Sequence, residues 1–278
     1  MDKIWILISF YLTITSIVGV EIRHMRVPAV VESGREPHVI LDCDYDIGDN
    51  EGSQIDVKWY FKDDPQPFYQ WLPGRNPQTI GDLFKGRIDL SFVVDEKNGF
   101  KRHRAIKIIR PTTELSGTYR CKVSSFVDED FETKRMTVYS PAQDLKLYYT
   151  KPDSRRINLT CKATGVYPKP EVSLTWGPLA NQRGETTTLT VERDGLFDIS
   201  VHKILLEEKL KPETVFGCIL SIPDTSYTVK EETMYFPGKV LNYRTNTSTS
   251  SVLFEPKRFL LLQSTLLWIL HYHFVRYQ

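Results

Sequence analysis

The stretch Leu115–Cys121 reads Leu-Ser-Gly-Thr-Tyr-Arg-Cys and ends at one of four cysteines in a chain of 278 residues. Cys43 precedes Cys121 by seventy-eight residues, and Trp59 lies sixteen residues after Cys43. This order is typical of two packed antiparallel sheets joined by a disulfide, with the indole ring against the sulfur atoms. Tyr119, two residues before the second cysteine, is where a tyrosine hydroxyl bonds the backbone of the preceding turn. The stretch therefore predicts a disulfide-linked β-sandwich in the first half of the chain.

The same pattern recurs in the second half. Trp176 follows Cys161 by fifteen residues, and Cys218 closes the pair fifty-seven residues after Cys161. Two such units in tandem indicate an all-β protein of two immunoglobulin-like sandwiches. A zinc site of four thiolates is the alternative, but no pair has Cys-x-x-Cys spacing. We predict disulfides Cys43–Cys121 and Cys161–Cys218, with core residues Trp59, Tyr119 and Trp176.

The cysteine separations also set the type and limits of each domain. Seventy-eight residues leave room for extra strands, so we predict a variable-type domain over residues 20–139. Fifty-seven residues suit a constant-type domain with fewer strands, over residues 142–238. Alternating apolar residues predict first-domain strands near 39–43, 55–61, 68–71, 88–92, 105–109, 119–121 and 136–138. In the second domain they predict strands near 158–161, 172–176, 197–201 and 215–222.

Composition and charge restrict the possible functions. The formal net charge is +1, so no field of one sign favours nucleic acid as a partner. An even cysteine count behind a hydrophobic N-terminus indicates disulfides and an oxidising compartment. Lys3 precedes the apolar run Ile4–Val18, which is short for a membrane span. We expect a signal peptide over residues 1–19, cleaved after Gly19, with a signal anchor as the alternative.

The C-terminal region has the composition of a membrane-attachment signal. A polar, Thr/Ser-rich stalk is expected over residues 239–258, followed by a hydrophobic tail over 259–278. Small residues, a polar spacer and an apolar tail are the order of a GPI-attachment signal, with Ser248 or Asn246 as the attachment site. A single transmembrane helix is the alternative, although Gln263 is among the residues that are costly in hydrocarbon. Simple secretion is the third possibility.

Several segments of the first domain are more specific than the spacing of cysteine and tryptophan: Arg26–Val31, Leu41–Asp46, Val57–Tyr60, Phe68–Tyr69, Pro73 and Ser116–Gly117. Together these segments resemble insect immunoglobulin-superfamily proteins of the beaten-path type. The second-domain segment Cys161–Pro170 resembles constant-type domains of antigen receptors and butyrophilin-like co-stimulatory ligands. The first resemblance implies a neuronal cell-surface or secreted protein. Such a protein would bind another immunoglobulin-superfamily molecule, the sidestep type in particular, and influence axon adhesion and guidance.

The outward side of the sheet containing Trp59 and Cys121 is the predicted partner-binding face. Strand alternation turns the neighbours of these core residues outward. Aromatic residues and arginine on an exposed sheet are the types that dominate binding energy. Local packing of some of these aromatics against a sheet edge is the alternative. The predicted partner-binding residues are Lys58, Tyr60, Tyr69, Trp71, Arg120 and Lys122.

Three charged clusters carry alternative hypotheses. Lys97 and Lys101–Arg104 surround Asn98-Gly99 and could bind a sulfated glycan, or form a solvated hairpin. The acidic run Asp128–Asp130 could steer a basic partner, or be a solvated hairpin tip. Asp42, Asp44, Asp46 and Asp49 resemble the start of a calcium loop, but Ile47 occupies the place of the required glycine.

Asn158 and Asn246 begin Asn-x-Ser/Thr acceptors for N-glycosylation, and strand alternation turns Asn158 outward. The sequence contains no nucleophile elbow and no phosphate-binding glycine loop, and His24, His38, His103 and His202 form no pair at helical metal-ligand spacing. His271 and His273 lie in the hydrophobic tail, where we expect no metal site. We therefore expect no enzyme, no cofactor and no metal. The predicted function is cell-surface recognition and adhesion. The alternative is a soluble or anchored module that binds a sulfated glycan or another extracellular ligand.

Overall fold

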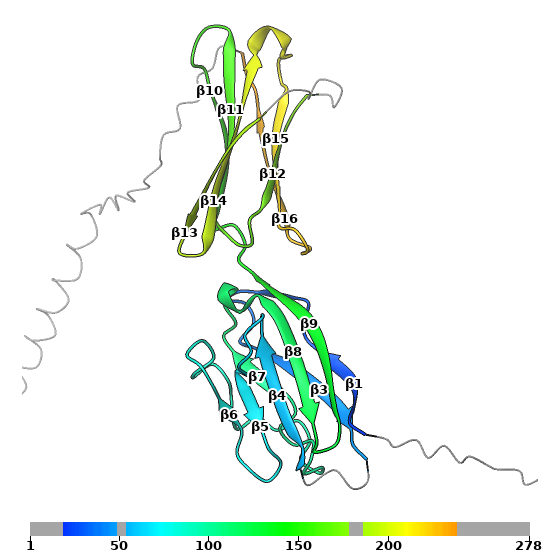
Figure 1. Ribbon diagram of the computed structural model, residues 1–278. Coiled ribbons are helices and arrows are strands. Elements are labelled where there is room, and N and C mark those ends of the chain that lie inside the picture. Colours follow the sequence, from blue (N-terminus) through cyan, green and yellow to red (C-terminus); the bar gives the residue numbers. More distant parts are fainter. Residues whose placement is uncertain (1–18, 49–53, 178–185, 238–278) are drawn as a thin grey trace, which may run out of the picture. The chain divides into compact units, whose positions relative to one another are not determined.

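The described part of the chain is built from β-strands, with short 3-10 helices at Thr113–Leu115 and Glu207–Lys209 (Figure 1). The computed structural model describes residues 19–48, 54–177 and 186–237. Its buried apolar side chains form two separate hydrophobic cores, one within residues 20–138 and one within residues 149–235. The predicted all-β fold of two sandwiches is confirmed. The predictions for the signal peptide, Asp49, the stalk, Asn246, Ser248 and the hydrophobic tail fall outside the described residues.

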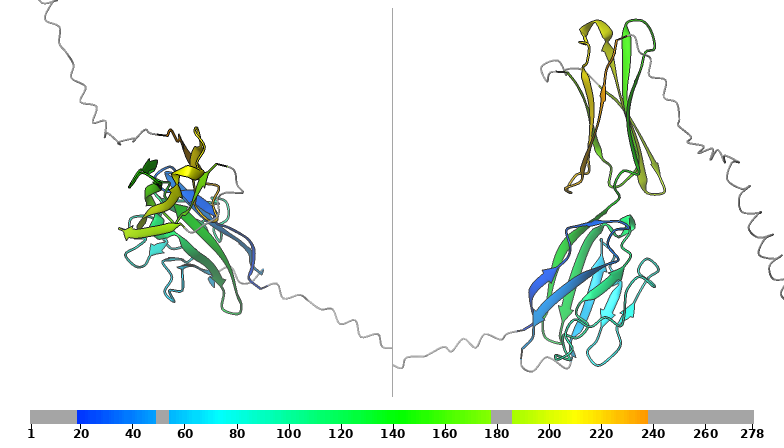
Figure 2. Two further views of the ribbon diagram at one scale, coloured as in Figure 1. Left: turned by 90° about the horizontal axis from the view of Figure 1, so that it is seen from above. Right: turned by 180° about the vertical axis from the view of Figure 1, so that it is seen from behind.

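The first sandwich has two sheets, which Figure 2 shows as two layers. One sheet has the order β1 (Glu21–Arg26), β3 (His38–Asp46) and β7 (Ile106–Ile109). The other has the order β2 (Val30–Glu32), β9 (Glu129–Tyr139), β8 (Gly117–Ser124), β4 (Asp56–Phe61), β5 (Tyr69–Trp71) and β6 (Gln78–Thr79). β2 pairs with β9 in parallel, and the other pairs are antiparallel. The strands β5 and β6 extend the larger sheet, as the variable type requires.

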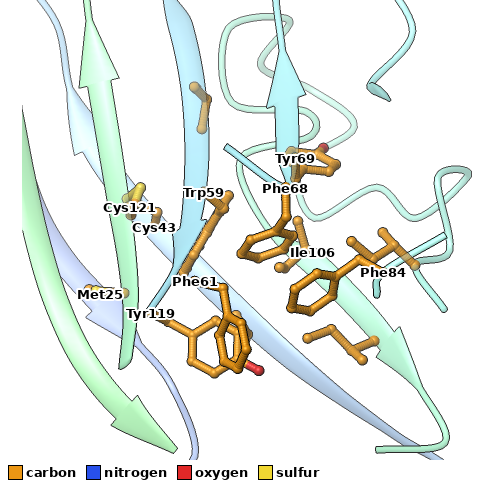
Figure 3. Close-up of a cluster of buried hydrophobic side chains, with 14 of the residues drawn as sticks. Met25, Cys43, Trp59, Phe61, Phe68, Tyr69, Phe84, Ile106, Tyr119 and Cys121 are labelled. Carbon is orange, nitrogen blue, oxygen red and sulfur yellow. A yellow bond between two sulfur atoms is a disulfide. The ribbon is translucent and has the colours of Figure 1, made fainter. Parts of the chain in front are cut away.

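The core of the first sandwich is the one that the cysteine spacing predicts. Cys43 and Cys121 form a disulfide with an S–S distance of 2.05 Å, and Trp59 is buried beside it (Figure 3). Tyr119 is also buried, and its hydroxyl donates to the carbonyl oxygen of Leu115 at 2.7 Å. This bond fixes the turn before β8 while the phenol ring fills the core.

The predicted strand at 88–92 is wrong. Ile88 makes a single bridge to Ile108, and residues 89–104 form turns and bends. Aspartate side chains explain the difference: Asp89 accepts from the backbone N–H of Ser91, and Asp95 accepts from two backbone N–H groups that follow it. Such local bonds compete with sheet pairing. We call residues 88–104 the closing segment.

The second sandwich has the strand arrangement of a constant-type domain. Its four-stranded sheet has the order β10 (Asp144–Thr150), β11 (Arg156–Val166), β14 (Leu196–Leu206) and β13 (Thr187–Arg193). Its three-stranded sheet has the order β12 (Glu171–Trp176), β15 (Val215–Ser221) and β16 (Thr228–Met234). Four strands facing three is the constant-type pattern. The predicted disulfide Cys161–Cys218 is present with an S–S distance of 1.95 Å, and Trp176 is buried.

Phe216 stands where the first sandwich has Tyr119, and it has no hydroxyl to fix the turn. Its ring packs against Tyr149 and Tyr235, with centroid distances of 5.5 and 5.7 Å. The turn before β15 is held by Thr214, whose hydroxyl donates to the carbonyl oxygen of Lys211 at 2.7 Å. A threonine hydroxyl therefore replaces the missing phenol hydroxyl in the second sandwich.

Candidate protein-binding face

Four of the six predicted partner-binding residues lie on the outward side of the larger sheet. Lys58 and Lys122 are opposite each other across β4 and β8, and Tyr60 is opposite Arg120. Trp59 and Cys121, which alternate with them, are opposite each other in the core. Since opposite residues of an antiparallel pair point to the same side, all four side chains point outward. All four are half-buried.

The other two, Tyr69 and Trp71, point into the core, so their prediction as binding residues is wrong. Tyr69 is opposite Trp59, and Trp71 is opposite the buried Val57, so both share the inward side. The Tyr69 hydroxyl donates to the carbonyl oxygen of His103 at 2.8 Å. The Trp71 indole N–H likewise donates to a backbone carbonyl oxygen, at 3.2 Å. These bonds let the two large rings be buried with their polar groups paired.

Exposed apolar side chains that sequence reasoning missed lie on β9 and in the turn before it. Phe131 is 61% exposed and is opposite Lys122, so it points outward. In the turn between β8 and β9, Phe126 is 82% exposed and Val127 is 77% exposed. Alternation backward from the buried Met136 would have placed Phe131 outward. We call the following set the front face: Lys58, Tyr60, Arg120, Lys122, Phe126, Val127, Phe131 and Arg135.

The cations of the front face fall into two groups. Lys58 pairs with Asp56 at 2.6 Å, and Lys122 pairs with Glu129 at 2.6 Å. Arg120 instead stacks on the ring of Tyr60, 4.5 Å from its centroid, and its buried Nε has no hydrogen-bond partner. Neither Arg120 nor Arg135 forms a salt bridge within the described residues. The front face therefore combines exposed aromatic surface with two uncompensated positive charges.

A hollow adjoins the front face at the turn between β8 and β9. Its volume is about 430 Å³. Phe126 and Ser125 line it from the turn, and Asp56 and Arg75 line it from the other side. In variable-type domains, loops at this end of the sandwich contribute to recognition. The hollow therefore extends the exposed surface beside Phe126.

The acidic run Asp128–Asp130 is not a free acidic tip. Asp128 accepts from the backbone N–H of Val20 at 3.1 Å, and Asp130 accepts from that of Ile22 at 2.8 Å. Glu129 pairs with Lys122. The bond of Asp130 joins β9 to β1, although the two strands belong to different sheets, and the bond of Asp128 holds the residue before β1 against the turn before β9. Among the described contacts Glu129 is paired with a cation, whereas the two aspartates keep their negative charge, so the hypothesis that the run steers a basic partner stays a prediction.

The basic run of the closing segment is likewise engaged within the molecule. Lys101 Nζ lies 3.3 Å from Asp44 and 3.0 Å from Asp46. Arg104 contacts Asp42 at 2.9 Å and Asp44 at 2.8 Å, and its side chain is only 12% exposed. The segment is therefore fastened across β3 by ion pairs, and these two cations are not free for a sulfated glycan.

The contacts between β3 and the closing segment also change the pKa values of residues on β3. A hydrogen bond from Arg23, and a second from Lys101, lower the pKa of Asp46 below its ordinary range. Burial raises the pKa of Tyr45, whose hydroxyl donates to the carbonyl oxygen of Phe100. Because the three carboxylates of β3 pair with cationic side chains, they do not form the calcium loop that their spacing resembles.

Two searches of the described residues bear on other classes of site. Residues 19–48, 54–177 and 186–237 contain no group of three or more His, Cys, Asp or Glu side chains placed to hold a metal ion. Within the same ranges, no helix has the length and apolar character needed to cross a bilayer.

Comparisons with known proteins place the fold. No protein-family model matches the chain, and no curated protein matches its sequence. The crystal structure of bovine butyrophilin is similar with a TM-score of 0.59 and 17% identity, over 75% of this chain and 95% of that chain. The structure of Rst D1-D2 is similar with a TM-score of 0.50 and 17% identity, over 77% of this chain and 97% of that chain.

A third similar chain comes from the crystal structure of ICOS in complex with ICOS-L and an anti ICOS-L VNAR domain. It has a TM-score of 0.51 and 14% identity, over 74% of this chain and 98% of that chain. The chain therefore has the fold of two immunoglobulin-like domains in tandem. At 14–17% sequence identity, the similarity shows the fold alone.

Proposed function

We propose that the protein is an extracellular recognition protein that binds another cell-surface protein through the front face of its first sandwich. The observation that carries this proposal is the exposure of Phe126, Val127 and Phe131 beside the uncompensated Arg120 and Arg135. When a partner buries a water-exposed phenylalanine, the free energy of the complex is lowered, and arginine pairs well with a partner carboxylate.

The rest of the molecule supports this role. Two disulfides are typical of proteins made in an oxidising, secretory compartment. One of the similar structures is itself a complex, of ICOS with ICOS-L. An interface of ordinary size buries about 800 Å² on each partner. A strongly curved pocket is not required for such binding, and the front face is an open sheet surface.

The partner that we propose is another immunoglobulin-superfamily surface protein. The first-domain segments that resemble beaten-path proteins make sidestep-type proteins the first partners to test, and adhesion or guidance of axons the first cellular role. The finer assignment depends on that resemblance, whereas the choice of binding face depends on exposure and charge.

The alternative, a sulfated-glycan-binding module, has weaker support. Its central residues, Lys101 and Arg104, are paired with aspartates of β3. Of the basic run, Lys97 and Arg102 remain without a salt bridge within the described residues. Two cations provide little of the electrostatic attraction that a polyanion site needs.

A binding screen tests the proposal. The full-length chain is screened against cells that display single immunoglobulin-type surface proteins of the same organism, with and without heparan sulfate. Phe131→Asp is compared with Phe100→Asp, because Phe100 is an exposed phenylalanine outside the front face. We expect a protein partner whose affinity falls about thirtyfold with Phe131→Asp, since a hot-spot residue contributes about 2 kcal/mol. Binding that disappears with the polysaccharide, or that Phe100→Asp weakens equally, contradicts the proposal.

We also propose that the apolar segment 259–275 is the cleaved tail of a GPI-attachment signal, and that the anchor that replaces it holds the protein on the outer face of the plasma membrane. Phosphatidylinositol-specific phospholipase C should then release the protein from intact cells. If the protein stays on the cells after this treatment and only detergent extracts it, a membrane-spanning helix holds the protein and the GPI proposal is wrong.

A further inference from the structure

The outward side of the four-stranded sheet in the second sandwich differs in character from the front face. Ile204 on β14 is 51% exposed, and Leu206 on the same strand is 41% exposed. The two side chains are two residues apart on one strand, so they point to the same side. Together they form an aliphatic patch on an exposed sheet surface.

Asn158 lies within this patch. It is opposite Ile204 on β14 and opposite the exposed Thr150 on β10. The neighbouring Arg156 is opposite Leu206. Because opposite residues of antiparallel strands point to the same side, the asparagine side chain stands directly beside Ile204.

The asparagine has no structural role that its contacts reveal. Its amide oxygen is buried and has no hydrogen-bond partner within the described residues. A buried acceptor without a partner costs about 1–3 kcal/mol. Threonine or valine would suit a strand better than asparagine does. Modification gives Asn158 a function that neither residue could perform.

We propose that Asn158 carries an N-linked glycan and that this glycan covers Ile204 and Leu206. The acceptor sequence Asn158-Leu159-Thr160 lies on one strand, with Leu159 buried and Asn158 pointing to the opposite side of the sheet. A glycan on the asparagine nitrogen therefore begins beside the aliphatic pair. The glycan keeps this face hydrated and prevents self-association through it.

The distribution of acceptor sequences is consistent with this role. Residues 20–139 contain no Asn-x-Ser/Thr sequence, and the only other one in the chain is at Asn246. The front face therefore stays free of sugar, while the second sandwich has one face covered. This inference is independent of the proposed partner, because it concerns a different sheet.

Occupancy is tested on the full-length chain from secretory cells. Peptide N-glycosidase F converts a glycosylated asparagine to aspartate, so digestion in heavy-oxygen water labels the residue. We expect the label at Asn158, detected by peptide mass spectrometry. An unlabelled Asn158 in the secreted protein overturns the proposal.

The covering role is tested by removing the glycan from the folded protein, which avoids a folding defect. After digestion of native protein, sedimentation velocity should show a shift from monomer toward dimers and larger species. The variant Ile204→Thr/Leu206→Thr, digested in the same way, should remain monomeric. If the digested wild-type protein stays monomeric, or if both proteins associate equally, the glycan does not cover this patch. Partner binding through the front face should be unchanged in every case.

Discussion

The front face and the closing segment of the first sandwich contain the same kinds of residue but use them differently. In the closing segment, Lys101 and Arg104 are paired with aspartates of β3, so their charges hold the segment in place. On the front face, Arg120 and Arg135 have no carboxylate partner within the described residues, and Phe131 is open to water. A charge cluster indicates a binding surface only when the fold leaves it uncompensated.

The aromatic residues of the larger sheet likewise differ in burial, and the difference separates core residues from surface residues. Trp71 and Phe131 are both large aromatics of one sheet, yet the first fills the core and the second is exposed. Substitution should therefore separate structural residues from binding residues. The former should lower stability, and the latter should lower only binding.

The largest loss of stability is expected for Trp71→Ala. Trp71 is fully buried, and truncation of a buried tryptophan costs about 3–5 kcal/mol. Urea unfolding of the full-length protein measures this loss. Gln70→Ala is a matched control, because Gln70 precedes Trp71 on β5 and is opposite Lys58 on the outward side. Equal stability of the two variants would mean that Trp71 lies outside the core.

A smaller loss, about 3 kcal/mol, is expected for Arg104→Leu. Removal of the guanidinium leaves Asp42 without a cationic partner in a largely buried site, while Asp44 keeps its contact with Lys101. Lys97→Leu, at an exposed position of the same segment, should change the free energy of unfolding by less than about 0.5 kcal/mol. If Arg104→Leu leaves stability unchanged and reduces retention on heparin, the basic run is a glycan site and the account of the closing segment is wrong.

The first sandwich also shows which features of the fold the sequence alone could predict. The spacing of Cys43, Trp59 and Cys121 predicted the sandwich because a disulfide and an indole require a fixed arrangement of strands. Tyr69 and Trp71 alternate with Gln70, so the sequence places both rings on one side of the strand, but which side that is depends on the residues of β4 that they face.

The closing segment was beyond sequence reasoning for another reason. Apolar alternation at 88–92 predicted a strand, but aspartate side chains bond the local backbone instead. The pairing of Arg104 with Asp42 joins residues sixty-two positions apart, and no local pattern predicts such a contact. By contrast, the alternation of residues along β9 could have predicted the outward position of Phe131.

The smallest effect is expected for Asp46→Asn, and it depends on pH. The pKa of Asp46 is lowered by hydrogen bonds from Arg23 and then Lys101, so its ionised form stabilises the folded state. This contribution is present above the unfolded-state pKa of about 3.9 and is lost as pH falls through the folded-state value.

Because the Asp46 side chain is 48% exposed, the loss at pH 7 should be only a few tenths of a kcal/mol. Unfolding curves of wild type and Asp46→Asn should differ at pH 7 and converge at low pH. A difference that grows as pH falls below 4 has the opposite sign and would exclude the ion pairs as its source.

Hydroxyl-radical footprinting of the full-length protein, alone and with the partner found in the screen, tests the choice of binding face most directly. The method measures the solvent access of individual side chains. We predict that the partner protects Phe126, Phe131 and Tyr60 from oxidation and leaves Phe100 unchanged. Protection of Phe100 with continued oxidation of Phe131 would contradict the assignment of the front face.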